Sequence, residues 1–244
     1  MSGVSLRPWN RIPIQECGEP LLELPAALLR LEPHPYAALG APYGREGSPF
    51  RLRSGVITRL LEAEARLQRQ QPAWRLAIFD AWRPVAVQRY MVEHAIQQEC
   101  RRAGVDRRQA SPARERLIAE VGRFWAPPSE DPSTPPPHST GAAVDLTLAD
   151  RKGQELAMGS PIDTIGAVSE PDHFLRRAER LREGPERLAC LEWHRRRTTL
   201  RGAMLAAGFF QHPREWWHYS WGDQLWAWGS GAGAARYGRA PEPG

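Results

Sequence analysis

The chain has 244 residues, enough for one substantial hydrophobic core or at most two small ones. Apolar residues make up 41% of it and charged residues 25%, an ordinary balance for a globular protein that argues against disorder. The formal net charge of +5 comes from scattered arginines, with one short run at residues 195–197. Nucleic-acid interfaces are usually denser in basic residues and interleaved with aromatics, so we expect no nucleic-acid partner.

The cysteines and the N-terminal residues indicate in which cellular compartment the protein is expected. Cys17, Cys100 and Cys190 are odd in number and form no CxxC pair, which disfavours a disulfide framework and favours a reducing compartment. Residues 1–20 show no apolar region behind a basic start, and the chain has no apolar run of about 18 residues. We therefore expect a cytoplasmic protein with no membrane partner. The sequence leaves its oligomeric state open.

The N-terminal half contains two predicted helices and one predicted strand. Residues 1–30 are expected to be an extended segment broken by prolines, and the Gly- and Pro-rich residues 33–50 a loop. Apolar residues recur at helical spacing between residues 55 and 70. Residues 74–80 are mostly apolar and bounded by turn signals, which indicates a buried strand. Pro84 suits the first turn of a helix that continues to about residue 102.

The C-terminal half begins with a proline-rich stretch. Residues 127–137 hold too many prolines for regular structure and form a stiff, extended lead-in to His138. Beyond it we predict short strands at residues 144–148, 209–210 and 216–221. Residues 166–185 are expected to be a long irregular or partly helical segment, and residues 191–207 a helix that ends at Gly208. The Gly/Ala/Pro-rich residues 229–244 are expected to form a flexible tail. Without internal repeats or a clear linker, a single α+β domain is the simplest arrangement.

One segment with ligating potential contains His138 and Asp145, seven positions apart. In a straight strand the two side chains would face opposite ways, so the chain must turn between them to bring both to one metal ion. Gly141 permits such a turn because glycine adopts positive φ at little steric cost. The alternative is a loop histidine and a strand-edge aspartate that never meet.

A second segment contains Glu215 and His218, with Trp216 and Trp217 between them. Aromatic walls raise the pKa of a carboxyl group toward the range useful to a general base. The alternative is a core strand whose tryptophans pack and whose polar residues lie at its ends. Together the two segments offer a His/His/carboxylate set and a spare carboxylate, and catalytic zinc typically takes three protein ligands and keeps a fourth position for water.

Four motifs occur in a recognisable order: residues 79–84 (FDAWRP), 138–148 (HSTGAAVDLTL), 158–163 (MGSPID) and 215–219 (EWWHY). With a looser match near Tyr36, they span about residues 30 to 220. This pattern closely resembles the D-alanyl-D-alanine dipeptidases, a group of zinc D,D-peptidases related to the hedgehog fold. The resemblance implies an α+β domain at residues 31–228, in which a small, mostly antiparallel sheet carries the zinc site and is flanked by helices.

The resemblance also implies roles for individual residues. One Zn²⁺ per chain would be held by His138, Asp145 and His218. Glu215 would be the catalytic base, and Arg83 would stabilise the negative charge that develops on the scissile carbonyl. An alternative for Arg83 is a structural ion pair with Asp80 or a helix C-terminus.

Two further residues are assigned to the substrate. Asp163 would meet the free amino group of the dipeptide, and Tyr36 would also contact the substrate. The chain departs from the family pattern at Pro136, where a serine is common, and at Trp82, where a tyrosine is more usual. The five remaining histidines are expected to be mostly solvated or packing residues: His34, His94, His173, His194 and His212.

The implied activity is hydrolysis of D-Ala-D-Ala to two D-alanines. Glu215 would activate a zinc-bound water, while zinc and Arg83 stabilise the oxyanion. One alternative is a D,D-carboxypeptidase acting on peptidoglycan stem peptides, and Asp163 favours the dipeptidase because it demands a free ammonium. Another is a non-catalytic, zinc-stabilised binding module, which the presence of both Glu215 and Arg83 disfavours. A role in glycopeptide resistance, cell-wall recycling or scavenging stays open.

Overall fold

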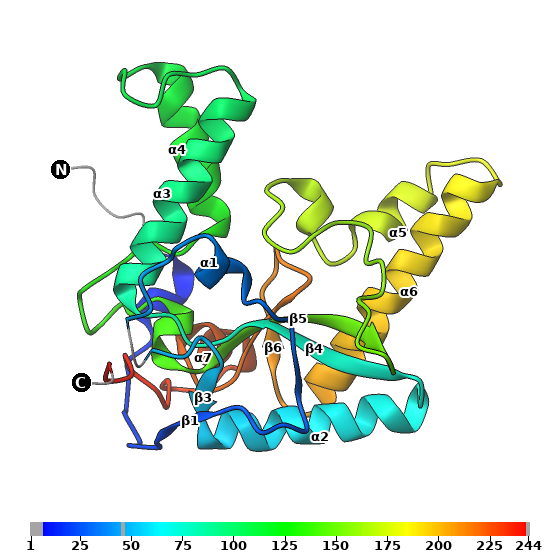
Figure 1. The fold of residues 1–244 in the computed structure, drawn as a ribbon, viewed down its shortest axis with the longest axis horizontal. Helices are drawn as coiled ribbons and strands as arrows, with labels where there is room; N and C mark the ends of the chain where they lie inside the picture. The colour runs from blue at the N-terminus through cyan, green and yellow to red at the C-terminus, as the bar shows by residue number, and fades with distance from the viewer. Residues whose placement is uncertain (1–6, 45–46, 243–244) are drawn as a thin grey trace.

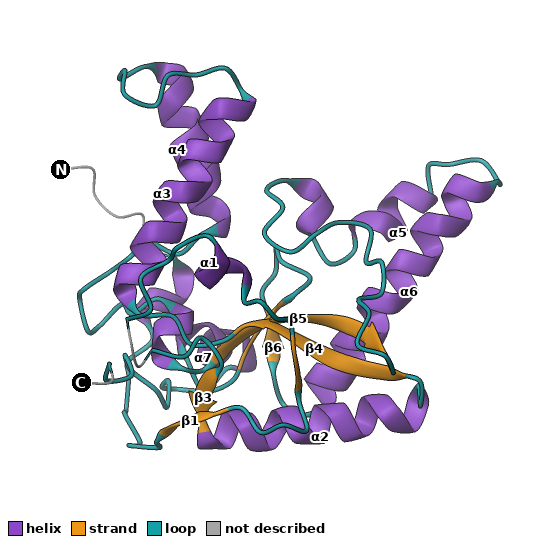
Figure 2. Ribbon diagram, in the orientation of Figure 1, coloured by secondary structure: helices purple, strands orange, loops and turns teal. Residues whose placement is uncertain are grey.

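A five-stranded sheet with the order β2-β4-β5-β7-β6 runs through the computed structural model, which describes residues 7–44 and 47–242 (Figure 1). Its strands are β2 (Leu29–Arg30), β4 (Trp74–Asp80), β5 (Ala143–Asp150), β6 (Phe210–Gln211) and β7 (His218–Ser220). β2 and β4 pair in parallel, and every other pair in this sheet is antiparallel. Helices flank it on both sides (Figure 2). The predicted α+β class with a mostly antiparallel sheet is confirmed.

The pairing register brings three polar residues of distant segments into one row. Asp80 at the end of β4 lies opposite Asp145 of β5, and Asp145 lies opposite His218 of β7. A bulge in β4 next to Asp80 shifts the register there. β5 is buried along its length except for its last residue, because it is central and covered on both faces. The middle of the sheet therefore carries charged groups at a depth where each needs a partner.

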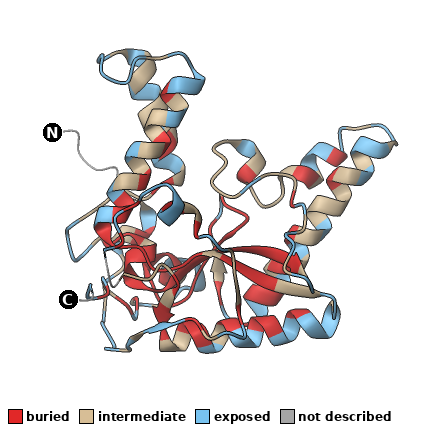
Figure 3. Cartoon of the chain, in the orientation of Figure 1, coloured by how far each residue is buried: buried red, intermediate tan, exposed pale blue. Residues whose placement is uncertain are grey.

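One face of the sheet packs on α2 (Ser54–Gln70) and α6 (Pro185–Ala206). The apolar stripe of α2 is turned inward (Figure 3). Leu60 and Leu67 on this stripe are fully buried. Leu200 and Met204 of α6 join the same core. This main cluster also takes in the tryptophans of the EWWHY motif, so the site rests on the best-packed part of the molecule.

The other face is covered by separate pieces. The hairpin of α3 (Val85–Arg102) and α4 (Pro112–Phe124) rises from one end, and α5 (His173–Ala178) leans on α6 at the other (Figure 1). The short helix α1 (Pro35–Ala38) lies between them in this view. A second cluster fills the base of the hairpin: Tyr36, Ala41, Tyr43, Val87, Met91, Ala95, Val121 and Trp125.

The N- and C-terminal segments close one end of the molecule. A two-stranded sheet joins β1 (Leu21–Glu23) to β3 (Arg51–Arg53), and the 3-10 helix η1 (Pro8–Arg11) packs on α7 (Gln224–Ser230). Two more 3-10 turns, η2 (Pro137–Thr140) and η3 (Ala167–Ser169), lie in the connections. In residues 7–44 and 47–242, no helix is long and apolar enough to cross a membrane.

Several elements differ from the sequence expectations. The helix predicted from residue 191 begins at Pro185, and the short helix α1 lies in the expected loop 33–50. α4 and α7 were not predicted. The tail expected to be flexible is packed over its described part: Ala235, Tyr237 and Ala240 are buried, and the Tyr237 hydroxyl donates to Glu19 at 2.8 Å. Residues 243–244 of that tail, and residues 1–6 of the N-terminal segment, lie outside the described residues.

Candidate active site

A left-handed turn delivers His138 to the sheet. His138 lies in η2, which ends at Gly141 with φ of 71°, and β5 begins two residues later. A Cβ atom at Gly141 would lie 2.4 Å from the Cδ1 atom of Leu21, so both the backbone and the space favour glycine. The turn predicted at Gly141 is present, and it brings His138 and Asp145 together.

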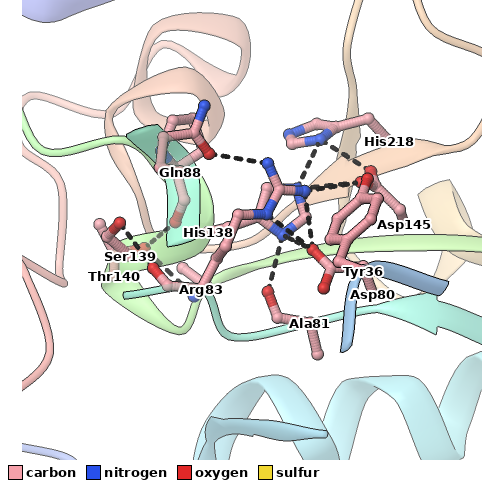
Figure 4. Close-up of polar contacts among 12 residues, drawn as sticks. Tyr36, Asp80, Ala81, Arg83, Gln88, His138, Ser139, Thr140, Asp145 and His218 are labelled. Carbon is pink, nitrogen blue, oxygen red and sulfur yellow. Dashed lines mark hydrogen bonds and ion pairs between the residues drawn. The ribbon is translucent and has the colours of Figure 1, made fainter. Parts of the chain in front are cut away.

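Three side chains meet at a buried point between η2, β5 and β7 (Figure 4). The Nε2 atom of His138 lies 3.2 Å from Asp145 Oδ2 and 3.2 Å from His218 Nδ1. His218 Nδ1 lies 3.0 Å from Asp145 Oδ1. Ligands about 2.0–2.1 Å from a tetrahedral ion are about 3.3 Å apart, so this donor set matches one.

The outer nitrogens of both rings have partners, and the partner of His138 is a carbonyl, which leaves the inner nitrogen of that ring as an acceptor. His138 Nδ1 donates to the carbonyl of Ala81 at 2.7 Å, and His218 Nε2 lies 3.3 Å from the Ser220 hydroxyl. Such contacts fix the tautomer and orientation of metal-binding histidines. Burial opposes ionisation of Asp145, but His138 and His218 outweigh it and hold the pKa of Asp145 well below its usual value.

Glu215 lies in the loop between β6 and β7, beside this set. Its Oε2 atom is 3.8 Å from His218 Nδ1, and its Oε1 atom is 3.6 Å from His212 Nδ1. Burial, reinforced by the nearby Asp145 carboxylate, raises the pKa of Glu215 to about 8, against the opposing influence of Arg7. A carboxyl group in this state takes up a proton readily.

Arg83 forms the structural ion pair with Asp80 that was considered from the sequence. Its Nε and Nη2 atoms donate to Asp80 Oδ2 at 3.0 and 2.7 Å, and Nη1 donates to Gln88 at 2.7 Å. Nη2 also lies 3.4 Å from Asp145 Oδ2 (Figure 4). The arginine is thus structurally paired and still lines the pocket with the metal-ligand set.

Asp80 connects the arginine with the histidines, a role that sequence reasoning missed. Besides Arg83, its carboxylate accepts from His34 Nε2 at 3.0 Å and from the Tyr43 hydroxyl at 3.1 Å. His138 Nδ1 lies 3.3 Å away. Burial opposes ionisation, yet Arg83 and the histidines lower the pKa of Asp80. The signal in the sequence was the position of Asp80 itself, within the FDAWRP motif.

Asp163 enters the same pocket from the loop after the MGSP turn. Its φ of 64° is unusual for a residue other than glycine and marks a constrained backbone. The Tyr36 hydroxyl donates to Asp163 Oδ2 at 2.7 Å. Partial burial and the Asp145 carboxylate raise the pKa of Asp163 to about 7. Tyr36, predicted to contact the substrate, is 1% exposed and reaches the pocket through Asp163.

Among the described residues, 15 line the pocket, including all predicted site residues except Tyr36: Arg7, Trp9, Arg83, Gln88, Phe124, Trp125, Ala126, Pro137, His138, Asp145, Asp163, His212, Glu215, Trp217 and His218. Arg7 and Trp9 come from the N-terminal segment, and His212, expected to be solvated or packing, is buried and packs on Trp9. No motif pointed to these three. A buried His/His/Asp set beside an unligated glutamate, in a pocket with an arginine, is the arrangement of a metal-dependent hydrolase.

Comparison with known proteins identifies the family. A family model described as D-ala-D-ala dipeptidase matches residues 30–230, close to the predicted domain at 31–228. The chain is 44% identical over 226 residues to a D-alanyl-D-alanine dipeptidase of Synechocystis sp., covering 91% of this chain and 90% of that protein. A dipeptidase of the same description from Streptomyces coelicolor is 38% identical over 84 residues, 34% of this chain and 35% of that protein.

Among solved structures, a variant of the vancomycin resistance D,D-pentapeptidase VanY in complex with Zn(II) aligns over 87% of this chain and 88% of that one, with 12% identity and a TM-score of 0.43. The family model and the Synechocystis relative show that the chain belongs to the D-Ala-D-Ala dipeptidase family. The predicted family and enzyme class, a metallopeptidase, are confirmed.

Proposed function

We propose that this protein hydrolyses the D-alanyl-D-alanine dipeptide to two D-alanines with one zinc ion per chain. The observation that carries the proposal is that one pocket combines the His138/Asp145/His218 set with Glu215 and Asp163. The family match and the 44% identity to a named dipeptidase support it. Three free thiols, at Cys17, Cys100 and Cys190, fit a reducing compartment, so we place the reaction in the cytoplasm.

His138, Asp145 and His218 would hold the zinc ion, through Nε2, a carboxylate oxygen and Nδ1 respectively. Their mutual distances of 3.0–3.2 Å and the partners of their outer nitrogens support this assignment. When bound, zinc supplies a Lewis acid and lowers the pKa of a coordinated water.

Glu215 is the proton carrier in this proposal. It takes the proton of the attacking water and passes it to the amine of the departing D-alanine. Two features support the role. Glu215 is buried beside the ligand set without being part of it, and burial raises its pKa to about 8. A base whose pKa lies near the working pH can both accept and release a proton.

Arg83 and Asp163 act on opposite ends of the first D-alanine. Arg83, held by Asp80 and Gln88, presents Nη2 beside Asp145 and stabilises the charge that develops on the carbonyl oxygen. Asp163 pairs with the free ammonium group. Tyr36 positions Asp163 by its hydrogen bond to Oδ2.

Asp163 also separates the dipeptidase from its nearest alternative. A D,D-carboxypeptidase acts on longer chains, in which the corresponding nitrogen is acylated and neutral. A partly buried carboxylate left facing a neutral amide loses its charged partner. The non-catalytic alternative gives no reason for an unligated Glu215 beside the ligand set.

The test is release of D-alanine from D-Ala-D-Ala and from its N-acetylated form by zinc-loaded protein. We expect hydrolysis of the free dipeptide and little or none of the acetylated one. Comparable cleavage of both would indicate a carboxypeptidase. Failure to cleave either, with one zinc bound per chain, would favour a binding module.

A further inference from the structure

The pocket contains a second arginine with no part in the chemistry described above. Arg7 lies just before η1, ahead of the residues 30–230 that match the family model. Its side chain lines the pocket on the side of Glu215 and His212. The other arginine of the lining, Arg83, is occupied by Asp80, Gln88 and Asp145.

Local structure holds Arg7 in place. Its backbone N–H donates to the Asn10 side chain at 2.9 Å. Trp9 is buried and packs edge-on against the ring of His212, with centroids 5.7 Å apart, and its ring also lies 5.7 Å from that of Trp228 in α7. The position of the guanidinium is thus built by the N-terminal segment and α7 together.

The hydrogen bonding of Arg7 is incomplete. Its Nη2 atom donates to the carbonyls of Gly122 and Trp125 at 3.0 and 2.9 Å, and Nη1 lies 3.4 Å from His212 Nε2. A guanidinium has five N–H donors, so Nε and one hydrogen of Nη1 have no acceptor among the described residues. No carboxylate of residues 7–44 or 47–242 forms an ion pair with it. The Nε–H bond and the remaining Nη1–H bond point to different sides of the guanidinium, so each can donate a single charge-assisted hydrogen bond to a carboxylate oxygen.

The pocket lining holds groups of both signs, as a zwitterion requires. Asp163, bound to Tyr36, offers a carboxylate, and Arg7 offers a guanidinium. The Arg83 guanidinium is 5.0 Å from the Tyr36 ring. From Asp145 a series of contacts leads through His218, Glu215 and His212 to Arg7. The lining residues Phe124, Ala126 and Pro137 offer no side-chain donor.

We propose that Arg7 binds the terminal carboxylate of the dipeptide substrate and thereby makes the N-terminal segment part of the specificity pocket. The inference rests on the proposed function, because that function supplies a substrate with an ammonium at one end and a carboxylate at the other. With Asp163 as the partner of the ammonium and Arg7 as the partner of the carboxylate, the pocket would select for both the length and the direction of the substrate.

The test compares Arg7→Gln with the wild type on D-Ala-D-Ala and on D-alanyl-D-alaninamide, whose C-terminus is neutral. Arg11→Gln is the matched control, an exposed arginine of the same segment that does not line the pocket. We expect Arg7→Gln to lower kcat/KM for the dipeptide by on the order of 10- to 100-fold, mainly through KM. For the wild type, kcat/KM should be lower on the amide than on the dipeptide by a similar factor. On the amide, kcat/KM of Arg7→Gln should be close to that of the wild type. Arg7→Lys should restore part of the loss.

Two kinetic results would overturn the inference. One is an unchanged kcat/KM in Arg7→Gln. The other is an equal loss on acid and amide, which would mean that Arg7 only supports the carbonyls of Gly122 and Trp125.

Calorimetric titration of D-Ala-D-Ala keeps this test separate from that of the function. It is made with Glu215→Gln and with the double variant Arg7→Gln/Glu215→Gln, neither of which is expected to turn the ligand over. We expect weaker binding by the double variant. If the wild type hydrolyses neither substrate, the proposed function fails. If Glu215→Gln and the double variant bind D-Ala-D-Ala equally well, the role of Arg7 is overturned as well.

Discussion

At the scale of single residues, the proposed function assigns substrate contact to Asp163 and the positioning of Asp163 to Tyr36, through the hydrogen bond between them. Asp163→Asn keeps the shape but removes the charge that would pair with the ammonium. We expect kcat/KM for D-Ala-D-Ala to fall on the order of 10- to 100-fold, with less discrimination against the N-acetylated dipeptide. Steady-state kinetics on both substrates measure this.

Tyr36→Phe is expected to have a smaller effect on kcat/KM than Asp163→Asn. It removes one hydrogen bond to Asp163 and leaves the charge, so a loss of about 2- to 10-fold is expected, again mainly in KM. A loss in Tyr36→Phe as large as in Asp163→Asn would contradict the division of roles, since it would give the hydroxyl its own contact with the substrate.

The sequence identified those candidate site residues that lie within short motifs. His138, Asp145, Glu215 and His218 were selected from two segments, and the structure brings all four together. It was silent about Arg7, because the contact between Arg7 and His212 joins residues 205 positions apart. No local pattern reports such a contact.

At the scale of elements, α6 holds the loop that carries Asp163. Arg197 of α6 is 2% exposed and donates to the carbonyls of Met158, Val168 and Glu170, as well as to the Ser160 hydroxyl. Its neighbour Arg195 has a different role, since it is exposed and pairs with Glu192. A single Arg197 side chain thus fixes both ends of the loop 158–170.

Arg197→Met is therefore expected to lower the free energy of unfolding by about 2–4 kcal/mol, because it leaves buried carbonyls without donors. It should also raise KM by loosening Asp163. Arg195→Met is the control and should stay within about 0.5 kcal/mol of the wild type. Denaturant unfolding of both variants measures these free energies of unfolding. Equal stability of the two would mean that the loop does not depend on Arg197.

Elements with strong patterns were predicted well, and weakly patterned ones were not. β4 was predicted at its observed residues, and α2 within one residue of its start. α4 has one buried residue, Val121, so its apolar periodicity is faint; in the structure Ser111 caps its N-terminus and Pro112 occupies its first turn. The packed C-terminal tail was missed because its composition suggests fraying, whereas Tyr237 anchors it to Glu19.

At the scale of the whole molecule, the proposed zinc site joins parts that are distant in sequence. His138 comes from η2, Asp145 from the central strand β5 and His218 from β7. The main hydrophobic core lies between the sheet, α2 and α6 and involves none of these side chains. The fold and the metal site are therefore separable in principle.

Chelation should lower the melting temperature without unfolding the protein at 25 °C. An ion that binds only the native state stabilises it by about 2.7 kcal/mol at 100 times its Kd. The melting temperature should then rise again with added zinc in a concentration-dependent way, as followed by calorimetry. The same titration of His218→Ala is the control and should show a much smaller zinc response. A wild-type melting temperature indifferent to both chelator and zinc would contradict the site.

The central claim is that Glu215 moves the proton during hydrolysis of D-Ala-D-Ala at the site formed by His138, Asp145 and His218. The most direct measurement is kcat of Glu215→Gln on D-Ala-D-Ala, with zinc content determined on the same sample. We predict one zinc per chain and a kcat reduced by about 10²- to 10⁴-fold, the range for a lost general base. A variant that holds one zinc and turns over the dipeptide at the wild-type rate would contradict the claim.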